Sequence, residues 1–103
     1  MYVLNITFSV EKIIFKDWIE WYNSEGEHLL SSDELVNAVK LFNIIGAETE
    51  DEETRCVHLE FKSNKELHRF YINGHKQFTE LITNKFGEKC LYFASVLELI
   101  KEK

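Results

Sequence analysis

The chain has 103 residues, of which 45% are hydrophobic and 29% are charged, and its formal net charge is −6. This composition is typical of a folded domain rather than a disordered segment, and the length predicts one domain over residues 1–103. Two cysteines cannot build a disulfide-rich scaffold or supply the four thiolates of an iron–sulfur cluster. No apolar run approaches the roughly 18 residues that span a bilayer, and no signal-peptide pattern is present. We therefore expect a cytoplasmic protein without a membrane partner.

The negative charge is concentrated in one segment, residues 46–53. This segment holds five carboxylates and leaves the rest of the chain with a sum of −1: Glu48, Glu50, Asp51, Glu52 and Glu53. The chain has no basic stripe of the kind that nucleic-acid binders carry, so we expect no nucleic-acid partner. The segment also lacks the spacing and the glycine of a calcium-binding loop, which favours a solvated hairpin tip.

The first half of the chain changes from a period of two to a helical period. Residues 2–10 alternate, with apolar side chains at the even positions, which predicts a half-buried strand. From Glu11 the large apolar residues recur at helical spacing, and Gly26 is the expected end of this helix. Ser31–Glu34 has the form of a capping box and predicts a short helical turn.

The second half predicts a hairpin, a helix and a last strand. We expect strands over Val36–Ile45 and Thr54–Lys62, joined by the acidic loop. Ser63–Glu66 is a capping box, and Phe86-Gly87 closes the helix that follows it. The apolar stripe of this helix consists of Leu67, Phe70, Tyr71, Phe78, Leu81, Ile82 and Phe86. Cys90–Ile100 is the last predicted strand, with Leu91, Phe93, Leu97 and Leu99 on its more apolar face.

The order of these elements predicts the fold class: an α+β, ferredoxin-like βαββαβ domain. Its antiparallel four-stranded sheet carries both helices on one face. The other, open face is expected to be mixed in polarity, with the side chains of Val3, Asn5, Thr7, His58, Glu60, Tyr92, Ala94 and Val96. Packing of two such faces in a homodimer is the favoured interpretation, and a solvated face in a monomer is the alternative.

Five segments along nearly the whole chain carry a family resemblance. They are Tyr2–Thr7, Trp18–Trp21, Tyr71–His75, Lys85–Gly87 and Phe93–Ile100. In order and spacing they resemble a small bacterial family, a domain of unknown function. The resemblance implies a dimeric α+β barrel, an architecture also used by small cofactor-free monooxygenases, and it implies no particular activity.

The chain departs from the family pattern at two places. A His, an apolar residue and Pro often end the first helix of the family, where this chain has Gly26-Glu27-His28. An Arg often stands at the position of Ala94. Any chemistry that depends on those residues is therefore not expected in this chain, whereas His75 does match the family.

Cys56, His58 and Glu60 stand at alternate positions of the third strand, so their side chains share one face of it. Neighbouring members would be about 6.6 Å apart at Cα, and Cys56 and Glu60 about 13 Å apart. Convergence of all three on one ion is therefore not expected, and no metal or cofactor is predicted. A hydrogen-bonded polar patch is the favoured interpretation, and a ligand site is the alternative. The candidate ligand-binding residues are His58, Glu60, Asn5, Thr7 and Tyr92.

His75 and His58 are the candidate catalytic residues, because histidine transfers protons near neutral pH. For His75 a surface or helix-packing role is favoured over a general base. Gly74 beside it indicates close backbone packing, a junction of two helices at Asn73-Gly74, or a kink that opens a pocket. Both cysteines are expected to be plain buried thiols.

Trp18 and Trp21 make the first helix apolar over a wide arc. They are candidate interface residues, because aromatic side chains are enriched in protein interfaces. The alternative is that some of these rings lie under residues 26–36.

Two functions remain open. The favoured one is a non-enzymatic homodimeric module that binds a small molecule or a partner protein. The alternative is a cofactor-independent enzyme of the small monooxygenase or isomerase type, acting on an aromatic or hydrophobic substrate. The enzyme needs a pocket that contains a titratable side chain with a shifted pKa.

Overall fold

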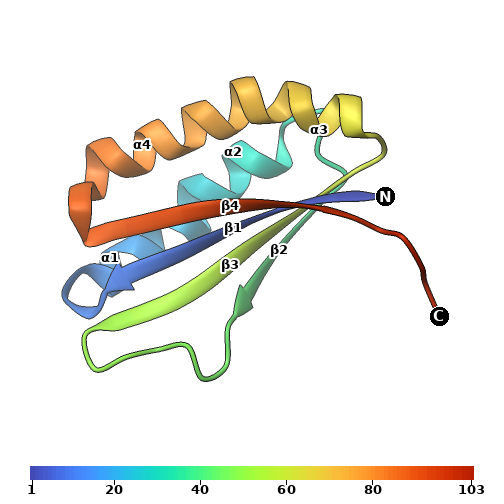
Figure 1. Ribbon diagram of the computed structural model, residues 1–103. Helices are drawn as coiled ribbons and strands as arrows, with labels where there is room; N and C mark the ends of the chain where they lie inside the picture. Colours follow the sequence, from blue (N-terminus) through green and yellow to red (C-terminus); the bar gives the residue numbers. More distant parts are fainter.

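The computed structural model describes residues 1–103 and contains a four-stranded antiparallel sheet with helices on one face (Figure 1). The strands are β1 (Tyr2–Glu11), β2 (Ala38–Asn43), β3 (Glu52–Phe61) and β4 (Cys90–Glu98). They lie in the order β2-β3-β1-β4, so β1 and β3 are central and β2 and β4 are edges. This arrangement confirms the predicted ferredoxin-like fold and the β2–β3 hairpin.

Two long helical segments cover the sheet side by side and run in opposite directions (Figure 1). The first consists of α1 (Lys12–Trp21), a π-helical turn η1 (Tyr22–Gly26) and α2 (Glu27–Ser31). The second consists of α3 (Asn64–Phe70), a π-helical turn η2 (Tyr71–His75) and α4 (Lys76–Phe86), followed by a 3₁₀ turn η3 (Gly87–Lys89). None of these helices is both long enough and apolar enough to pass through a membrane.

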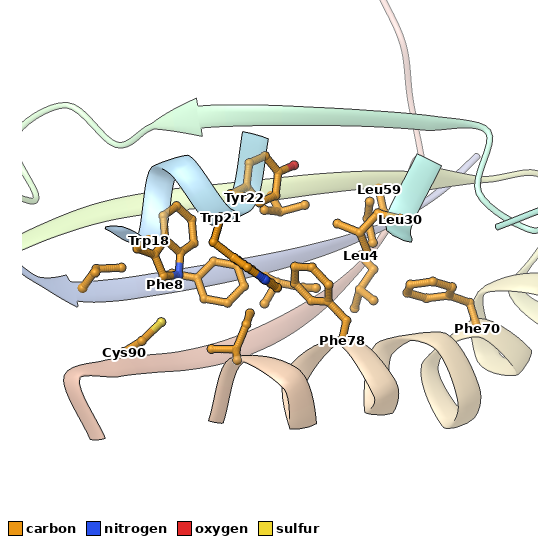
Figure 2. Packing of buried hydrophobic residues seen from close by; sticks show 14 of the residues in the cluster. Leu4, Phe8, Trp18, Trp21, Tyr22, Leu30, Leu59, Phe70, Phe78 and Cys90 are labelled. Atoms are coloured by element: carbon orange, nitrogen blue, oxygen red, sulfur yellow. The ribbon is translucent and has the colours of Figure 1, made fainter. Parts of the chain in front are cut away.

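The alternation of β1 determines which face of the sheet is covered. Leu4, Ile6, Phe8 and Val10 have no exposed surface, because their side chains point toward the helices. Aromatic rings fill the space between the two layers, as Figure 2 shows for Trp18, Trp21, Phe70 and Phe78 around β1. Burial of each such ring stabilises the fold by about 1.5–3 kcal/mol.

Gly26 does not end the first helix, contrary to the prediction. The helical segment runs through Gly26 to Ser31. A Cβ atom at position 26 would lie 3.0 Å from Tyr22 Cδ1 and 3.1 Å from Trp21 Cζ3. The glycine therefore gives room to two aromatic rings, and its backbone stays in the helical region, with φ −60° and ψ −50°.

The capping box over Ser31–Glu34 does not begin a helical turn, so that prediction is wrong. Ser31 is the last residue of α2. The Asp33 carboxylate accepts a hydrogen bond of 2.9 Å from the backbone N–H of Leu35. This Asx-type bond holds a turn that leads into β2, and the backbone N–H of Val36 donates to the Asp33 carbonyl oxygen in the same turn. The Asp33 side chain offers the backbone an alternative to continued helical hydrogen bonding.

The ends of the second helical segment are as predicted. The Ser63 hydroxyl accepts a hydrogen bond of 3.2 Å from the backbone N–H of Glu66, which makes it the N-cap of α3. Gly87 ends α4 with a φ of +59°, a region that favours glycine.

The predicted apolar stripe of this helix is interrupted at η2. Tyr71 is 41% exposed and Leu81 is 45% exposed, whereas Gly74 and His75 turn inward. A π-turn contains more residues than an α-turn, so it changes the phase of the side chains that follow. A Cβ atom at Gly74 would lie 2.6 Å from the Phe70 ring, which supports the close-packing interpretation of this glycine.

The register of β4 corrects the predicted composition of the open face. Phe8 pairs with Tyr92, Ile6 with Ala94 and Leu4 with Val96. Paired residues of antiparallel strands point to the same side, so Tyr92, Ala94 and Val96 lie on the helix side of the sheet. The open face instead carries Leu91, Phe93, Ser95 and Leu97 of β4.

Candidate functional site

A hydrogen-bonded network crosses the middle of the open sheet face. Asn5, His58 and Lys40 lie side by side on three neighbouring strands, because β1 pairs with β3 and β3 with β2 in this register. The His58 Nδ1 atom lies 3.1 Å from Asn5 Oδ1, and its Nε2 atom lies 3.1 Å from Glu60 Oε2. Lys40 Nζ donates to the same Glu60 oxygen at 3.0 Å. His58 and Glu60, which we expected to share one face of the third strand, are thus joined by a hydrogen bond, and Lys40 belongs to the same network.

The charges of this network are partly shielded from water. The Glu60 and His58 side chains are 19% and 21% exposed. The ammonium group of Lys40, with a smaller effect from His58, holds the pKa of the Glu60 carboxyl below its usual range. The two ring nitrogens of His58 contact Asn5 on β1 and Glu60 on β3, and Lys40 on β2 joins them through Glu60. The network therefore links three strands through side-chain hydrogen bonds on the open face.

Large apolar side chains flank the network at both edges of the sheet. Leu91, Phe93 and Leu97 of β4 are 58%, 63% and 46% exposed, and Phe42 of β2 is 48% exposed. The Phe42 ring meets the His58 ring edge to face at 5.9 Å. We name these four residues together with the network the open-face patch. Leu91, Phe93 and Leu97 form an exposed apolar stripe along β4, and Phe42 lies across the sheet from it. Exposed apolar stripes of this kind are typical of an interaction surface.

Thr7 and Cys56 lie opposite each other in the next row of the open face. The Cys56 sulfur lies 3.9 Å from the Val57 carbonyl oxygen, so it does not join His58 and Glu60. No group of three or more His, Cys, Asp or Glu side chains is arranged to hold a metal ion. Burial raises the pKa of the Cys56 thiol, and it raises the pKa of Cys90 to about 11. Neither sulfur is a thiolate near neutral pH.

Tyr92 is separated from the other candidate ligand-binding residues. It packs near Phe8 on the helix side, at 6.2 Å between ring centroids. Asn5, Thr7, His58 and Glu60 share the open face, so the structure brings four of the five candidates together. Lys40 was missed, because the predicted hairpin did not fix the register of β2 against β3, and that register places Lys40 beside His58.

His75, the other catalytic candidate, is buried in the helix layer. Its side chain stacks on Tyr71 at 4.5 Å, it is 7% exposed, and its Nε2 atom has no hydrogen-bond partner. Burial lowers the pKa of His75 below the ordinary 6.5, because the charged ring would lose its hydration. His75 lines neither the hollow between α1 and α4 nor the smaller one between α2 and α4.

The depressed pKa of His75 predicts a loss of stability in acid. Below about pH 6.5 the unfolded chain binds a proton at this residue and the folded chain does not. The free energy of unfolding therefore decreases as the pH decreases. One proton accounts for at most about 1.4 kcal/mol per pH unit. Urea unfolding from pH 7 to pH 5 should show a smaller decline for His75→Gln than for the unaltered chain. His68→Gln, at an exposed position, is the control, and equal declines in all three proteins would contradict the prediction.

Trp18 and Trp21 lie inside the core of the chain itself. Trp18 is fully buried and Trp21 is 6% exposed. Trp18 stacks on Tyr22 at 5.7 Å, and Trp21 lies between Phe78 and Phe86 of α4 at 5.7 and 5.9 Å. Trp21 therefore packs the two helical segments together, Trp18 packs α1 against Phe8 of β1, and both rings are almost wholly covered within their own chain.

Solved structures similar to this one share its fold at low sequence identity. An EthD family protein of Bacillus halodurans C-125 has a TM-score of 0.71 at 14% identity, covering 97% of this chain and 100% of its own. A candidate antibiotic biosynthesis monooxygenase of Deinococcus radiodurans has a TM-score of 0.69 at 6% identity, covering 100% and 96%. A dimeric ferredoxin-like protein of unknown function from Thermobifida fusca has a TM-score of 0.65 at 11% identity, covering 96% and 92%. At these identities the likeness shows the fold alone.

Sequence comparison gives a more specific assignment. Among curated proteins, none matches this chain. A family model matches residues 1–100, which is nearly the whole sequence, and agrees with the resemblance carried by the five collinear segments. The chain therefore belongs to the DUF4286 family, a domain of unknown function.

Proposed function

We propose that this protein is a non-enzymatic homodimeric binding module, in which the open sheet faces of two copies pack against each other. The observation that carries the proposal is the open-face patch, where four large exposed apolar side chains surround a hydrogen-bonded network. An antiparallel sheet with one face in water normally places polar side chains at such positions. Burial against a second copy removes the apolar groups from water.

The charges of the patch allow two copies to approach. Lys40 and Glu60 form an ion pair of 3.0 Å in the middle of the face and neutralise each other. The net charge of −6 lies mainly in the loop over residues 46–53, beyond the middle of the sheet. Repulsion between two negatively charged chains is therefore weakest at this face, and the facing polar groups are self-complementary about a two-fold axis.

The area of the face is large enough for a dimer. Strands of 10, 6, 10 and 9 residues, about 4.8 Å apart and with about 3.3 Å per residue, give roughly 550 Å² in projection for each copy. Side-chain relief adds to this, so two copies bury about 1,000 Å² or more, which is the size that specific interfaces reach. The Thermobifida fusca neighbour, described as a dimeric ferredoxin-like protein, supports the same assembly.

A cofactor-independent enzyme is the second candidate, supported by the candidate antibiotic biosynthesis monooxygenase among the structural neighbours. Its catalytic groups would be His58 or His75. The arrangement of both favours the binding module, because His58 is held by two hydrogen bonds and His75 lies outside the two helix-layer hollows.

Native mass spectrometry of untagged protein, purified gently from its own host, tests the proposal. We expect twice the mass of the chain. A monomer at micromolar concentration would contradict the paired sheets. Extra mass retained by the dimer would identify a bound small molecule directly, and turnover of that molecule by the purified protein would replace the binding module with the enzyme.

A further inference from the structure

A hollow of about 550 Å³ lies between the first and second helical segments, on the side of the molecule opposite the open-face patch. It forms where the beginning of α1 lies beside the end of α4 and η3 (Figure 1). The residues that line it are Ile14, Asp17, Glu20, Trp21, Ser24, Glu25, Lys85, Phe86 and Lys89. We call it the helix groove.

The floor of the helix groove is aromatic and rigid. Trp21 reaches from α1 toward Phe78 of α4 (Figure 2), and its ring meets Phe86 edge to face at 5.9 Å. The Trp21 indole N–H donates to Glu25 Oε2 at 3.1 Å, so both the ring and this carboxylate are fixed. A preformed floor of this kind binds an apolar or aromatic group at low cost in conformational entropy.

The two walls of the groove carry opposite charges. Asp17, Glu20 and Glu25 come from the first helical segment, and Lys85 and Lys89 come from the end of α4 and from η3. None of these five side chains takes part in the four ion pairs of the structure, which lie elsewhere. Two of the five contact the floor itself, since Glu25 accepts from the Trp21 indole and Lys85 Nζ lies 5.9 Å from the centroid of the Phe86 ring. The groove thus holds its cations and its anions on opposite walls.

We propose that the helix groove binds a zwitterionic small molecule of the amino-acid type with an aromatic or bulky apolar side chain. The carboxylates of the first wall would take the ligand's ammonium group, and Lys85 and Lys89 would take its carboxylate. The ligand's side group would rest on the partly exposed Phe86 ring and against the small part of Trp21, 6% of its surface, that remains exposed. The inference rests on the proposed function, because it names the ligand class of the binding module.

The charge pattern distinguishes this ligand from simpler ones. A cation alone would leave Lys85 and Lys89 without an anionic partner, and an aromatic anion would leave Asp17 and Glu20 without a cationic one. A ligand with both charges completes both walls. Each charge pair at such an exposed site contributes up to a factor of roughly five in affinity.

Three probes with the same phenyl body test the proposal: L-phenylalanine, 2-phenylethylamine, which lacks the carboxylate, and 3-phenylpropionate, which lacks the ammonium. Their binding is followed by the two tryptophan indole N–H signals in ¹H–¹⁵N NMR spectra. We expect the Trp21 signal to move on titration and the buried Trp18 signal to stay, which makes Trp18 the internal control. Phenylalanine should bind roughly fivefold more tightly than either analogue.

Two neutralised variants separate the walls. Lys85→Gln with Lys89→Gln should lower the affinity for phenylalanine to that of 2-phenylethylamine and leave 2-phenylethylamine unchanged. Asp17→Asn with Glu20→Gln should lower the affinity for 2-phenylethylamine. Lys101→Gln with Lys103→Gln makes the same charge change outside the groove, and it should affect neither probe.

The outcomes that overturn the proposal are equal affinities for the three probes, no movement of the Trp21 signal at saturating phenylalanine, or an equal effect of the control pair. Failure of the dimer is a separate result, because the groove is built from one chain and lies away from the open-face patch. A monomer that binds phenylalanine would contradict only the paired sheets. A dimer that binds none of the probes would contradict only this inference.

Discussion

A Phe93→Asp variant is expected to be monomeric at concentrations where the proposed pairing of open faces makes the unaltered chain a dimer. Phe93 is 63% exposed on the open face, so its replacement removes no contact from the core of its own chain. In the paired sheets the new carboxylate would lose its hydration against apolar side chains of the second copy. Loss of a large aromatic contact costs about 2 kcal/mol or more, which weakens dimerisation roughly thirtyfold or more. Analytical ultracentrifugation over a range of protein concentrations measures this change.

Ile13→Asp is the matched control for that experiment. Ile13 is 80% exposed on α1, on the helix side of the sheet, and the substitution adds the same charge. We expect this variant to have the same molar mass as the unaltered chain at each concentration. If Phe93→Asp remains a dimer, or if Ile13→Asp dissociates equally, then the open-face patch is not the interface.

The sequence predicted the central parts of the fold because there one physical constraint decides the outcome. The alternation of residues 2–10 assigns the buried face of β1 without ambiguity, since only its even positions are consistently apolar. Ser63 and Gly87 fix the ends of the second helical segment by capping and by a positive φ, both of which are local effects. The shared face of His58 and Glu60 follows from their spacing on one strand.

The face assignment of β4 could not be made in the same way. Three consecutive residues of β4 are all apolar: Leu91, Tyr92 and Phe93. The alternation of apolar and polar residues that assigned the faces of β1 is therefore absent from this strand. The strand lies at an edge of the sheet, and both of its faces stay partly exposed. Only pairing with β1, in which Tyr92 faces Phe8, decides which side chains reach the open face.

The tryptophans and Gly26 show a second limit, which is tertiary packing. A glycine near the end of a periodic segment commonly stops a helix, but here it gives room to the rings of Trp21 and Tyr22. The periodicity of the sequence showed that the first helix is apolar over a wide arc. It could not show which other element covers that arc, because contacts between elements far apart in the chain leave no trace in local periodicity. Lys40 was missed for a related reason, because its partner Glu60 is 20 positions away.

A Trp18→Ala variant is expected to lose about 3–5 kcal/mol of the free energy of unfolding, as large-to-small substitutions of buried aromatic residues do. Trp18 has no exposed surface, meets Phe8 at 5.3 Å and stacks on Tyr22 at 5.7 Å with an interplanar angle of 7°. The substitution leaves a cavity where the first helical segment meets β1, and the stacked Tyr22 ring loses its partner. For a domain whose total stability is about 5–15 kcal/mol, this is a large fraction. Urea unfolding followed by circular dichroism measures it.

The same experiment decides between the core and interface roles of Trp18 when it is made in the Phe93→Asp background, where dimerisation no longer contributes to stability. A core residue destabilises the monomer by the full amount, because all of its contacts are within one chain. An interface residue would leave the monomer nearly as stable as before. Ile13→Ala, at an 80% exposed position, should change the free energy of unfolding by less than about 0.5 kcal/mol. A Trp18→Ala monomer that is no less stable than this control would contradict the assignment of Trp18 to the core.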